Sequence, residues 1–139
     1  MNGRVAAVLG VGPGLGAAVA RRFAGEGFAV AMMARREESL GEIRQDIEGD
    51  GGTAIPLSAD ATDPDSVAAA FERVRAELGD PEVLVYNAGA FQMGGVLEVS
   101  PARFDECFRA NCAGPFFMPL FTGVRGRVIL GRSAQSAGA

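Results

Sequence analysis

Short apolar segments recur along the chain at a regular spacing, separated by segments in which polar and apolar residues mix. Five of them are mostly apolar over four to six residues, at 5–9, 28–33, 53–58, 83–86 and 127–130. Runs of this length with few polar positions are typical of strands buried on both faces of a parallel sheet. The pattern therefore predicts five buried strands.

Helical spacing characterises the segments between these strands. In the first of them, Leu15, Val19 and Phe23 lie on one face of a helix. Two later ones begin with Asp63-Pro64 and Ser100-Pro101, each of which offers a side-chain cap followed by proline at the first helical position. Strands that alternate with helices in this way predict an α/β fold with a doubly wound parallel sheet of Rossmann type.

The helix that begins at Ser100 is followed by two prolines, Pro115 and Pro119. A proline inside a helix removes one hydrogen bond and clashes with the preceding turn. We therefore expect this helix to end near Cys112 and not to continue as one long helix.

A glycine-rich turn, residues 10–16, joins the first strand to the first helix. The first N–H groups of such a helix are unpaired and lie at the positive end of its dipole, so the turn attracts phosphate. Glycine also lets a pyrophosphate approach the backbone closely. The segment therefore predicts a dinucleotide-binding turn.

Two registers of glycine are open in this turn. Gly12, Gly14 and Ala17 fit the pattern G-x-G-x-x-A, whereas Gly10, Gly14 and Gly16 fit G-x-x-x-G-x-G. We prefer the second register, because Gly10 stands where the apolar run stops.

The preferred register resembles the Thr-Gly-x-x-x-Gly-x-Gly fingerprint of the short-chain dehydrogenase/reductase family, with Leu9 in place of threonine. Two further turns are similar to family motifs. Residues 60–63, Asp-Ala-Thr-Asp, resemble the family's Asp-x-Thr-Asp turn, and residues 86–89, Tyr-Asn-Ala-Gly, resemble its Asn-Asn-Ala-Gly, with Tyr86 replacing the first asparagine. The resemblance is good over 4–114 and poor over 115–139.

This resemblance implies a single NAD(P)-binding Rossmann domain over residues 1–139. Complete family members are much longer, so the sheet is expected to be incomplete at the C-terminus. The implied function is an NADP(H)-dependent oxidoreductase that transfers hydride to or from a small-molecule carbonyl or alcohol substrate. The alternative is a non-catalytic or truncated NADP-binding module.

The end of the second strand bears on the choice of cofactor. Arg35 and Arg36 follow it, and a guanidinium group there can pair with the 2′-phosphate of NADP, so NADP(H) is favoured. NAD(H) stays possible, with Glu37 as the acceptor for its ribose. The competing interpretation is that both arginines only form a solvated helix start.

Asp60 ends the third strand, where a carboxylate can accept from the adenine amino group while backbone N–H groups keep it ionised. The alternative is that Asp60 and Asp63 only shape the turn and cap the next helix, and for Asp63 this interpretation is preferred. The predicted cofactor contacts are Gly10, Gly12, Gly14, Leu15, Gly16, Arg35, Arg36, Asp60, Ala61, Asn87, Ala88 and Gly89.

Two catalytic positions are implied by the resemblance. Asn111 matches an Asn-x-x-Gly motif whose asparagine sustains a proton relay through water, although an asparagine near a helix end is often only a cap or kink. Ser133, with Ser136 as the alternative, stands where the family's catalytic serine follows the fifth strand.

The family's Tyr-x-x-x-Lys pair is missing, because Tyr86 is the only tyrosine and the chain contains no lysine. In the family this pair handles the hydroxyl proton. We expect cofactor binding with little or no turnover from the chain as written.

Composition excludes several other classes of protein. A net charge of −4 without a basic cluster argues against nucleic acid, and no run approaches the ~20 apolar residues of a membrane span. No membrane partner and a cytoplasmic location are therefore expected. The chain has no histidine, and Cys107 and Cys112 point to different faces of a predicted helix, so we expect reduced thiols and no metal site.

A homo-oligomer is expected because several apolar residues have no evident partner: Phe116, Phe117, Met118, Leu120 and Phe121.

Overall fold

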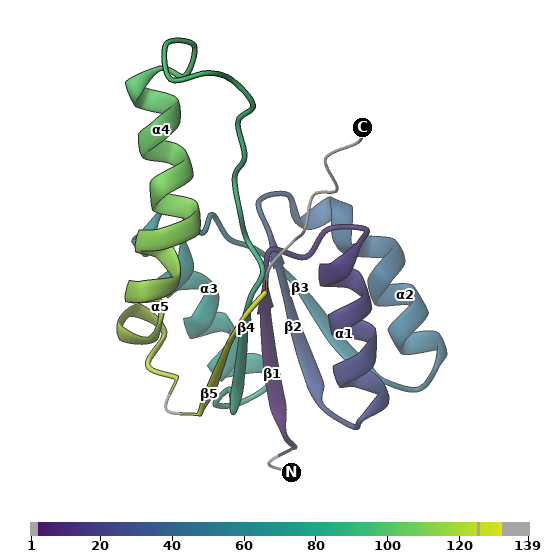
Figure 1. Cartoon of the computed structure of the whole chain (residues 1–139). Helices are drawn as coiled ribbons and strands as arrows, with labels where there is room; N and C mark the ends of the chain where they lie inside the picture. Colours follow the sequence, from purple (N-terminus) through teal and green to yellow (C-terminus); the bar gives the residue numbers. More distant parts are fainter. Residues whose placement is uncertain (1–2, 125, 132–139) are drawn as a thin grey trace.

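The computed structural model describes residues 3–124 and 126–131, without the side chain of Phe121. Five parallel strands form one sheet in the order β3-β2-β1-β4-β5 (Figure 1). Their bounds are β1 Val5–Leu9, β2 Ala29–Ala34, β3 Thr53–Ser58, β4 Val83–Tyr86 and β5 Arg127–Leu130. The predicted Rossmann-type sheet is confirmed.

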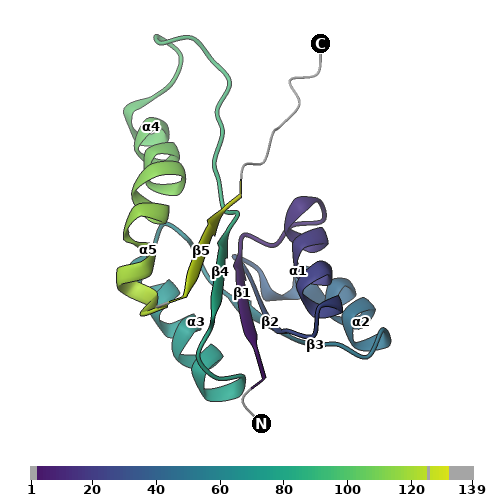
Figure 2. The same cartoon turned by 60° about the horizontal axis from the view of Figure 1, so that its bottom comes forward.

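Helices cover both faces of this sheet (Figure 2). On one side lie α1 (Leu15–Gly25) and α2 (Gly41–Gly49), which a 3₁₀ turn, η1 (Glu37–Leu40), connects to β2. On the other side lie α3 (Pro64–Glu77) and a rod made of α4 (Pro101–Phe108), the π-helical turn η2 (Arg109–Ala113) and α5 (Gly114–Thr122).

The central strand β1 contributes to the core on both faces. Its residues alternate, so Ala6 and Val8 pack in the cluster with α1 and α2, whereas Ala7 and Leu9 pack in the cluster with α3 and α5. Phe71 of α3 is fully buried in the second cluster. Burial of a side chain of this size stabilises the fold by about 1.5–3 kcal/mol.

The rod from Pro101 to Thr122 contradicts the expectation that Pro115 and Pro119 would end the helix near Cys112. The N–H of Gly114 donates to the carbonyl of Arg109, five residues earlier, so the helix widens into a π turn just before Pro115. This widening relieves the clash between a proline ring and the carbonyl four residues before it. Pro119 lies inside α5, which ends three residues later at Thr122.

Met118 also differs from expectation, because it has a partner. Only 1% of it is exposed, and it belongs to the core cluster that contains Phe71. By contrast, Phe116 and Leu120 of the same helix are 79% and 77% exposed. The side chain of Phe121 lies outside the described part.

Over residues 3–124 and 126–131, no helix is both long and apolar enough to cross a membrane. Within the same ranges, no group of three or more cysteine or acidic side chains is placed to hold a metal ion.

Candidate cofactor site

A cleft of about 580 Å³ opens where the carboxyl ends of β1 to β4 meet. The chain runs from β1 outward to β3 and then returns to β4 on the other side of β1, and crevices at such switch points bind ligands in α/β folds. The lining residues are Gly10, Val11, Gly12, Ala34, Arg35, Arg36, Ser39, Ala59, Asp60, Ala61, Thr62, Asn87, Ala88, Gly89, Ala90, Phe91, Arg103, Glu106 and Ala110.

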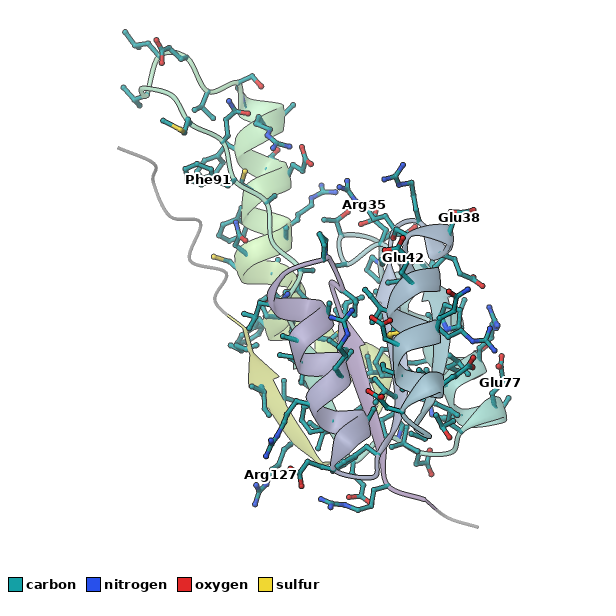
Figure 3. The ribbon with its side chains drawn as sticks, turned by 90° about the vertical axis from the view of Figure 1, so that its right-hand side faces the viewer. Arg35, Glu38, Glu42, Glu77, Phe91 and Arg127 are labelled. Carbon is teal, nitrogen blue, oxygen red and sulfur yellow. The ribbon has the colours of Figure 1, made fainter. Side chains whose placement is uncertain are left out.

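A larger hollow, of about 1190 Å³, lies at the opposite end of the strands. Figure 3 shows Arg35 and Arg127 at opposite ends of the molecule; Arg35 lines the cleft and Arg127 lines the hollow. The wall of the hollow includes Arg4 and Glu82, which form an ion pair at 3.6 Å. None of the predicted cofactor residues lines it, so the smaller cleft is the candidate site.

The four glycines of the turn fall into two groups. Gly10 has φ of +92°, and a Cβ on it would lie 2.3 Å from the backbone nitrogen of Ala88. A Cβ on Gly16 would lie 2.6 Å from the Gly10 carbonyl oxygen. Gly12 and Gly14 meet nothing within 4 Å, so the packing of the protein does not require them to lack a side chain. The tight positions fit the register that starts at Gly10, and the open positions leave room for a ligand at the backbone.

The N-terminus of α1 differs from those of α3 and α4. Asp63 caps α3 by accepting from the N–H groups of Asp65 and Ser66, which confirms its interpretation as a cap, and Ser100 caps α4. Gly14, at the same position of α1, has no side chain to offer. The first N–H groups of α1 therefore lack a side-chain cap at the edge of the cleft.

Arg35 and Arg36 are exposed residues at the end of β2. Neither forms an ion pair with any other residue in the described ranges, whereas Glu37 lies 3.9 Å from a guanidinium nitrogen of Arg73. Both arginines line the cleft, so their charges are available to an anion there.

Asp60 is held as a carboxylate. Its Oδ1 accepts from the N–H of Thr62 at 2.9 Å and from the hydroxyl of Thr62 at 2.7 Å. These two bonds lower the pKa of Asp60, with a smaller contribution from the charge of Arg35, while burial opposes them. Both bonds use Oδ1, so Oδ2 can accept a further donor in the cleft.

Asn87 ties the end of β4 to the glycine turn. Its side-chain nitrogen donates to the Gly10 carbonyl at 3.0 Å, and its N–H donates to the Leu9 carbonyl at 2.7 Å. Its Oδ1 is buried and has no hydrogen-bond partner among residues 3–124 and 126–131.

Asn111 lies in the π turn and reaches the segment that follows β4. Its Nδ2 donates to the Ala90 carbonyl at 2.6 Å, and the N–H of Ala90 donates to its Oδ1 at 3.2 Å. Asn111 is therefore a link between the rod and the wall of the cleft, and it is not a helix cap. Ser133 and Ser136 lie outside the described residues.

Sequence reasoning missed Arg103 as a residue of the cleft. Its guanidinium group donates to the Phe91 carbonyl at 3.0 Å, to Gln92 Oε1 at 3.1 Å and to the carboxylate of Glu106. These bonds fasten the segment after β4 to α4, and Figure 3 shows Phe91 beside that helix. No local motif marks an arginine in a first helical turn for such a role.

Tyr86 precedes Asn87 and is 2% exposed. Its hydroxyl donates to the carbonyl of Ala110 in the π turn. Burial raises the pKa of Tyr86 to about 12, and the nearby Asp60 charge adds to this shift. The hydroxyl therefore stays protonated near neutral pH.

The chain is similar to a family model and to several known proteins. The family model described as short chain dehydrogenase matches residues 4–126. The versicolorin reductase of Emericella nidulans is 34% identical over 119 residues, which cover 85% of this chain and 45% of that protein. The D-threitol dehydrogenase of Mycolicibacterium smegmatis is 31% identical, and the match covers 99% of this chain and 55% of that protein.

Solved structures agree with these relatives. A short-chain dehydrogenase/reductase from Serratia marcescens superposes with a TM-score of 0.87 at 28% identity, over 98% of this chain and 58% of that one. A blue fluorescent protein from a metagenomic library, solved in complex with NADPH, superposes with a TM-score of 0.85 at 33% identity, over 99% of this chain and 60% of that one.

The chain thus spans about half the length of these two curated relatives. Within that span, the family model, the relatives and the fold all agree. The chain belongs to the short-chain dehydrogenase family of oxidoreductases.

Proposed function

We propose that this chain binds NADP(H) in the cleft at the carboxyl ends of β1 to β4. It would form the cofactor-binding part of an oxidoreductase that acts on a small-molecule carbonyl or alcohol. The observation that carries the proposal is the glycine turn, where Gly12 and Gly14 face open space in front of a helix that has no side-chain cap. An anion is the group that such a helix end attracts.

Nine of the proposed cofactor contacts line the cleft, and the other three, Gly14, Leu15 and Gly16, lie at the N-terminus of α1. The turn would hold the pyrophosphate through Gly10, Gly12, Gly14, Leu15 and Gly16, the adenosine end would lie against Arg35, Arg36, Asp60 and Ala61, and the nicotinamide end would lie beside Asn87, Ala88 and Gly89. All of them belong to one proposed domain, residues 1–139.

The preference for NADP(H) over NAD(H) rests on the two arginines after β2. Guanidinium groups that form no ion pair within the described part of the chain can pair with a 2′-phosphate, and such bonds are charge-assisted. Glu37, the alternative acceptor for an NAD ribose, already lies near Arg73. The NADPH complex of a structural neighbour is consistent with this choice.

Residues of this chain would support hydride transfer by positioning. When bound, the cofactor supplies or accepts the hydride, and the protein orients it. Asn111 would fix the wall of the cleft through Ala90 and sustain a proton relay, and Ser133, or Ser136, would donate to the substrate oxygen. The chain has no lysine and its one tyrosine is buried, so no Tyr-x-x-x-Lys pair is available from it.

We therefore expect the 139-residue chain to bind NADPH with little or no turnover. A non-catalytic NADP-binding module is the second candidate, favoured by the same missing pair. Steady NADPH oxidation above background by the purified chain would contradict this expectation.

Self-association is also proposed, because Phe116 and Leu120 project from α5 into solvent. Sedimentation of the purified chain at several concentrations tests it. A monomer at every concentration would contradict it.

The binding proposal is tested by titrating NADPH against the purified chain and following nucleotide fluorescence. Gly14→Ala adds a methyl group where the pyrophosphate would approach, so NADPH affinity should fall at least about tenfold, equivalent to about 1.4 kcal/mol. Gly49→Ala is the matched control, because Gly49 also meets nothing within 4 Å but ends α2, outside the cleft. Equal affinities for the two variants would refute the proposed site.

A further inference from the structure

The π turn within the rod leaves one buried carbonyl without a donor from the helix. The N–H of Gly114 donates to the carbonyl of Arg109, five residues earlier, and not to the carbonyl of Ala110. In the same register, the donor for Ala110 would come from position 115, which is a proline and has no N–H. Ala110 is 5% exposed, so water does not readily replace this donor. A buried carbonyl that stays unpaired costs about 1–3 kcal/mol.

Tyr86 supplies the missing donor from the end of β4. Its hydroxyl donates to the Ala110 carbonyl, and the side chain is almost fully buried between the sheet and the rod. Gly114 fits against it, since a Cβ at that position would overlap the hydroxyl and lie 3.2 Å from Cζ of the ring. These three residues are therefore complementary. The Tyr86 hydroxyl provides the donor that Pro115 lacks, and Gly114 leaves room for that hydroxyl.

Asn111 is the next residue after Ala110, and its side chain reaches Ala90 through two hydrogen bonds. A change of register at Ala110 would rotate Asn111 about the helix axis, by about 100° per residue, and remove it from Ala90. The contact between Tyr86 and Ala110 thus controls where Asn111 points.

We propose that Tyr86 is a positioning residue for Asn111. The Tyr86 hydroxyl holds the π turn in the register in which Asn111 joins the rod to the wall of the cleft at Ala90. This inference rests on the proposed function only in giving Asn111 a role beside the cofactor. The geometry of the link itself does not depend on a bound nucleotide.

The test measures amide hydrogen exchange at Ala90 in the full 139-residue chain without nucleotide. Tyr86→Phe removes only the hydroxyl, and the exchange rate at Ala90 should rise toward that of Asn111→Ala, in which the acceptor is gone. The rate at Ala31, in the core strand β2, reports global opening and should rise much less.

Thr122→Val is the matched control for loss of a buried hydroxyl. The Thr122 hydroxyl donates to the Met118 carbonyl at 2.9 Å, in the same rod but away from the π turn. This variant should leave the ratio of the Ala90 and Ala31 rates unchanged. If Tyr86→Phe also leaves that ratio unchanged, Tyr86 is only a packing residue and the proposal is overturned.

A second variant separates positioning from packing. Pro115→Ala restores a backbone donor five residues after Ala110, so the tyrosine hydroxyl becomes less necessary. The single variant should keep the wild-type Ala90 rate, which shows that the turn has kept its π register without the proline. In this background, Tyr86→Phe should change the Ala90 rate less than it does in the wild-type chain. An equal change in both backgrounds would contradict the proposal.

NADPH titration of the same samples keeps the two proposals distinguishable. Failure of the wild-type chain to bind NADPH would refute the proposed function and leave the Ala90 result standing. NADPH binding together with an unchanged Ala90 ratio in Tyr86→Phe would refute the positioning role alone.

Discussion

Arg35 and Asp60 show how single side chains give charge to the end of the cleft where we propose that adenosine binds. Two hydrogen bonds from Thr62 hold Asp60 as an acceptor, and Arg35 adds positive charge beside it. Because the two charges have opposite signs, they suit different parts of one ligand: a phosphate for Arg35 and an amino group for Asp60. The positions of both residues in the fold could be predicted from the sequence, since Arg35 directly follows β2 and Asp60 lies two residues after β3.

Replacement of Arg35 by alanine tests the choice of cofactor. Loss of charge-assisted hydrogen bonds of about 1.5–3 kcal/mol should weaken NADPH binding by roughly tenfold to hundredfold and leave NADH affinity nearly unchanged. Fluorescence titrations with both nucleotides measure the difference. Arg127→Ala, at the opposite end of the sheet (Figure 3), is the control and should alter neither affinity. An equal loss for both nucleotides in Arg35→Ala would count against recognition of a 2′-phosphate.

Tyr86 is the only tyrosine and the chain has no tryptophan, so its ionisation can be followed directly by near-ultraviolet absorbance. The pKa of Tyr86 is raised from 10.0 to about 12 in the folded chain. A raised pKa means that the neutral form stabilises the fold. This contribution is complete below pH 10 and is lost as the pH rises toward 12.

The folded chain should therefore lose stability between about pH 10 and pH 12, with tyrosinate appearing only near the upper limit. Tyr86→Phe should lack this loss. Tyrosinate absorbance that rises with a midpoint near 10 while the chain is still folded would contradict the burial of Tyr86.

The helices differ in whether a side chain caps their N-termini. Asp63 and Ser100 each cap a helix with a side chain, and these caps could be read from the sequence. The continuation of the rod past Pro115 could not, because it depends on a π turn, and the Ala110 carbonyl of that turn accepts from Tyr86 of β4, far away in the sequence. The burial of Met118 could not be predicted for a similar reason, since it packs in a core cluster whose other members lie outside α5, such as Phe71 of α3.

Removal of the Asp63 cap tests whether this residue is structural. Asp63→Ala should lower the free energy of unfolding by about 1 kcal/mol, because two N–H groups of the first turn of α3 lose their acceptor. Urea denaturation measures the change. Asp65→Ala, in the same helical turn, should cost less, and NADPH affinity should be unchanged in both variants. A cost for Asp65→Ala equal to that for Asp63→Ala would show that charge near the helix end, and not the cap, provides the stabilisation.

At the scale of the whole molecule, the sheet has two ends that could attract an anion. The cleft lies at the carboxyl ends of the strands, and the larger hollow at the other end includes Arg4, Arg22, Arg75 and Arg127. Arg4, Arg22 and Arg75 each lie near an acidic side chain, and Arg127 is exposed, whereas the cleft offers backbone N–H groups beside open glycines. Backbone donors in a fixed turn favour phosphate without the cost of breaking an ion pair.

A crystal structure of the chain with NADPH tests this account most directly. We expect the pyrophosphate within hydrogen-bond distance of the first N–H groups of α1, beside Gly14, with the 2′-phosphate at Arg35. Nucleotide bound in the hollow beside Arg127, or a glycine turn that stays free of phosphate at saturating NADPH, would contradict it.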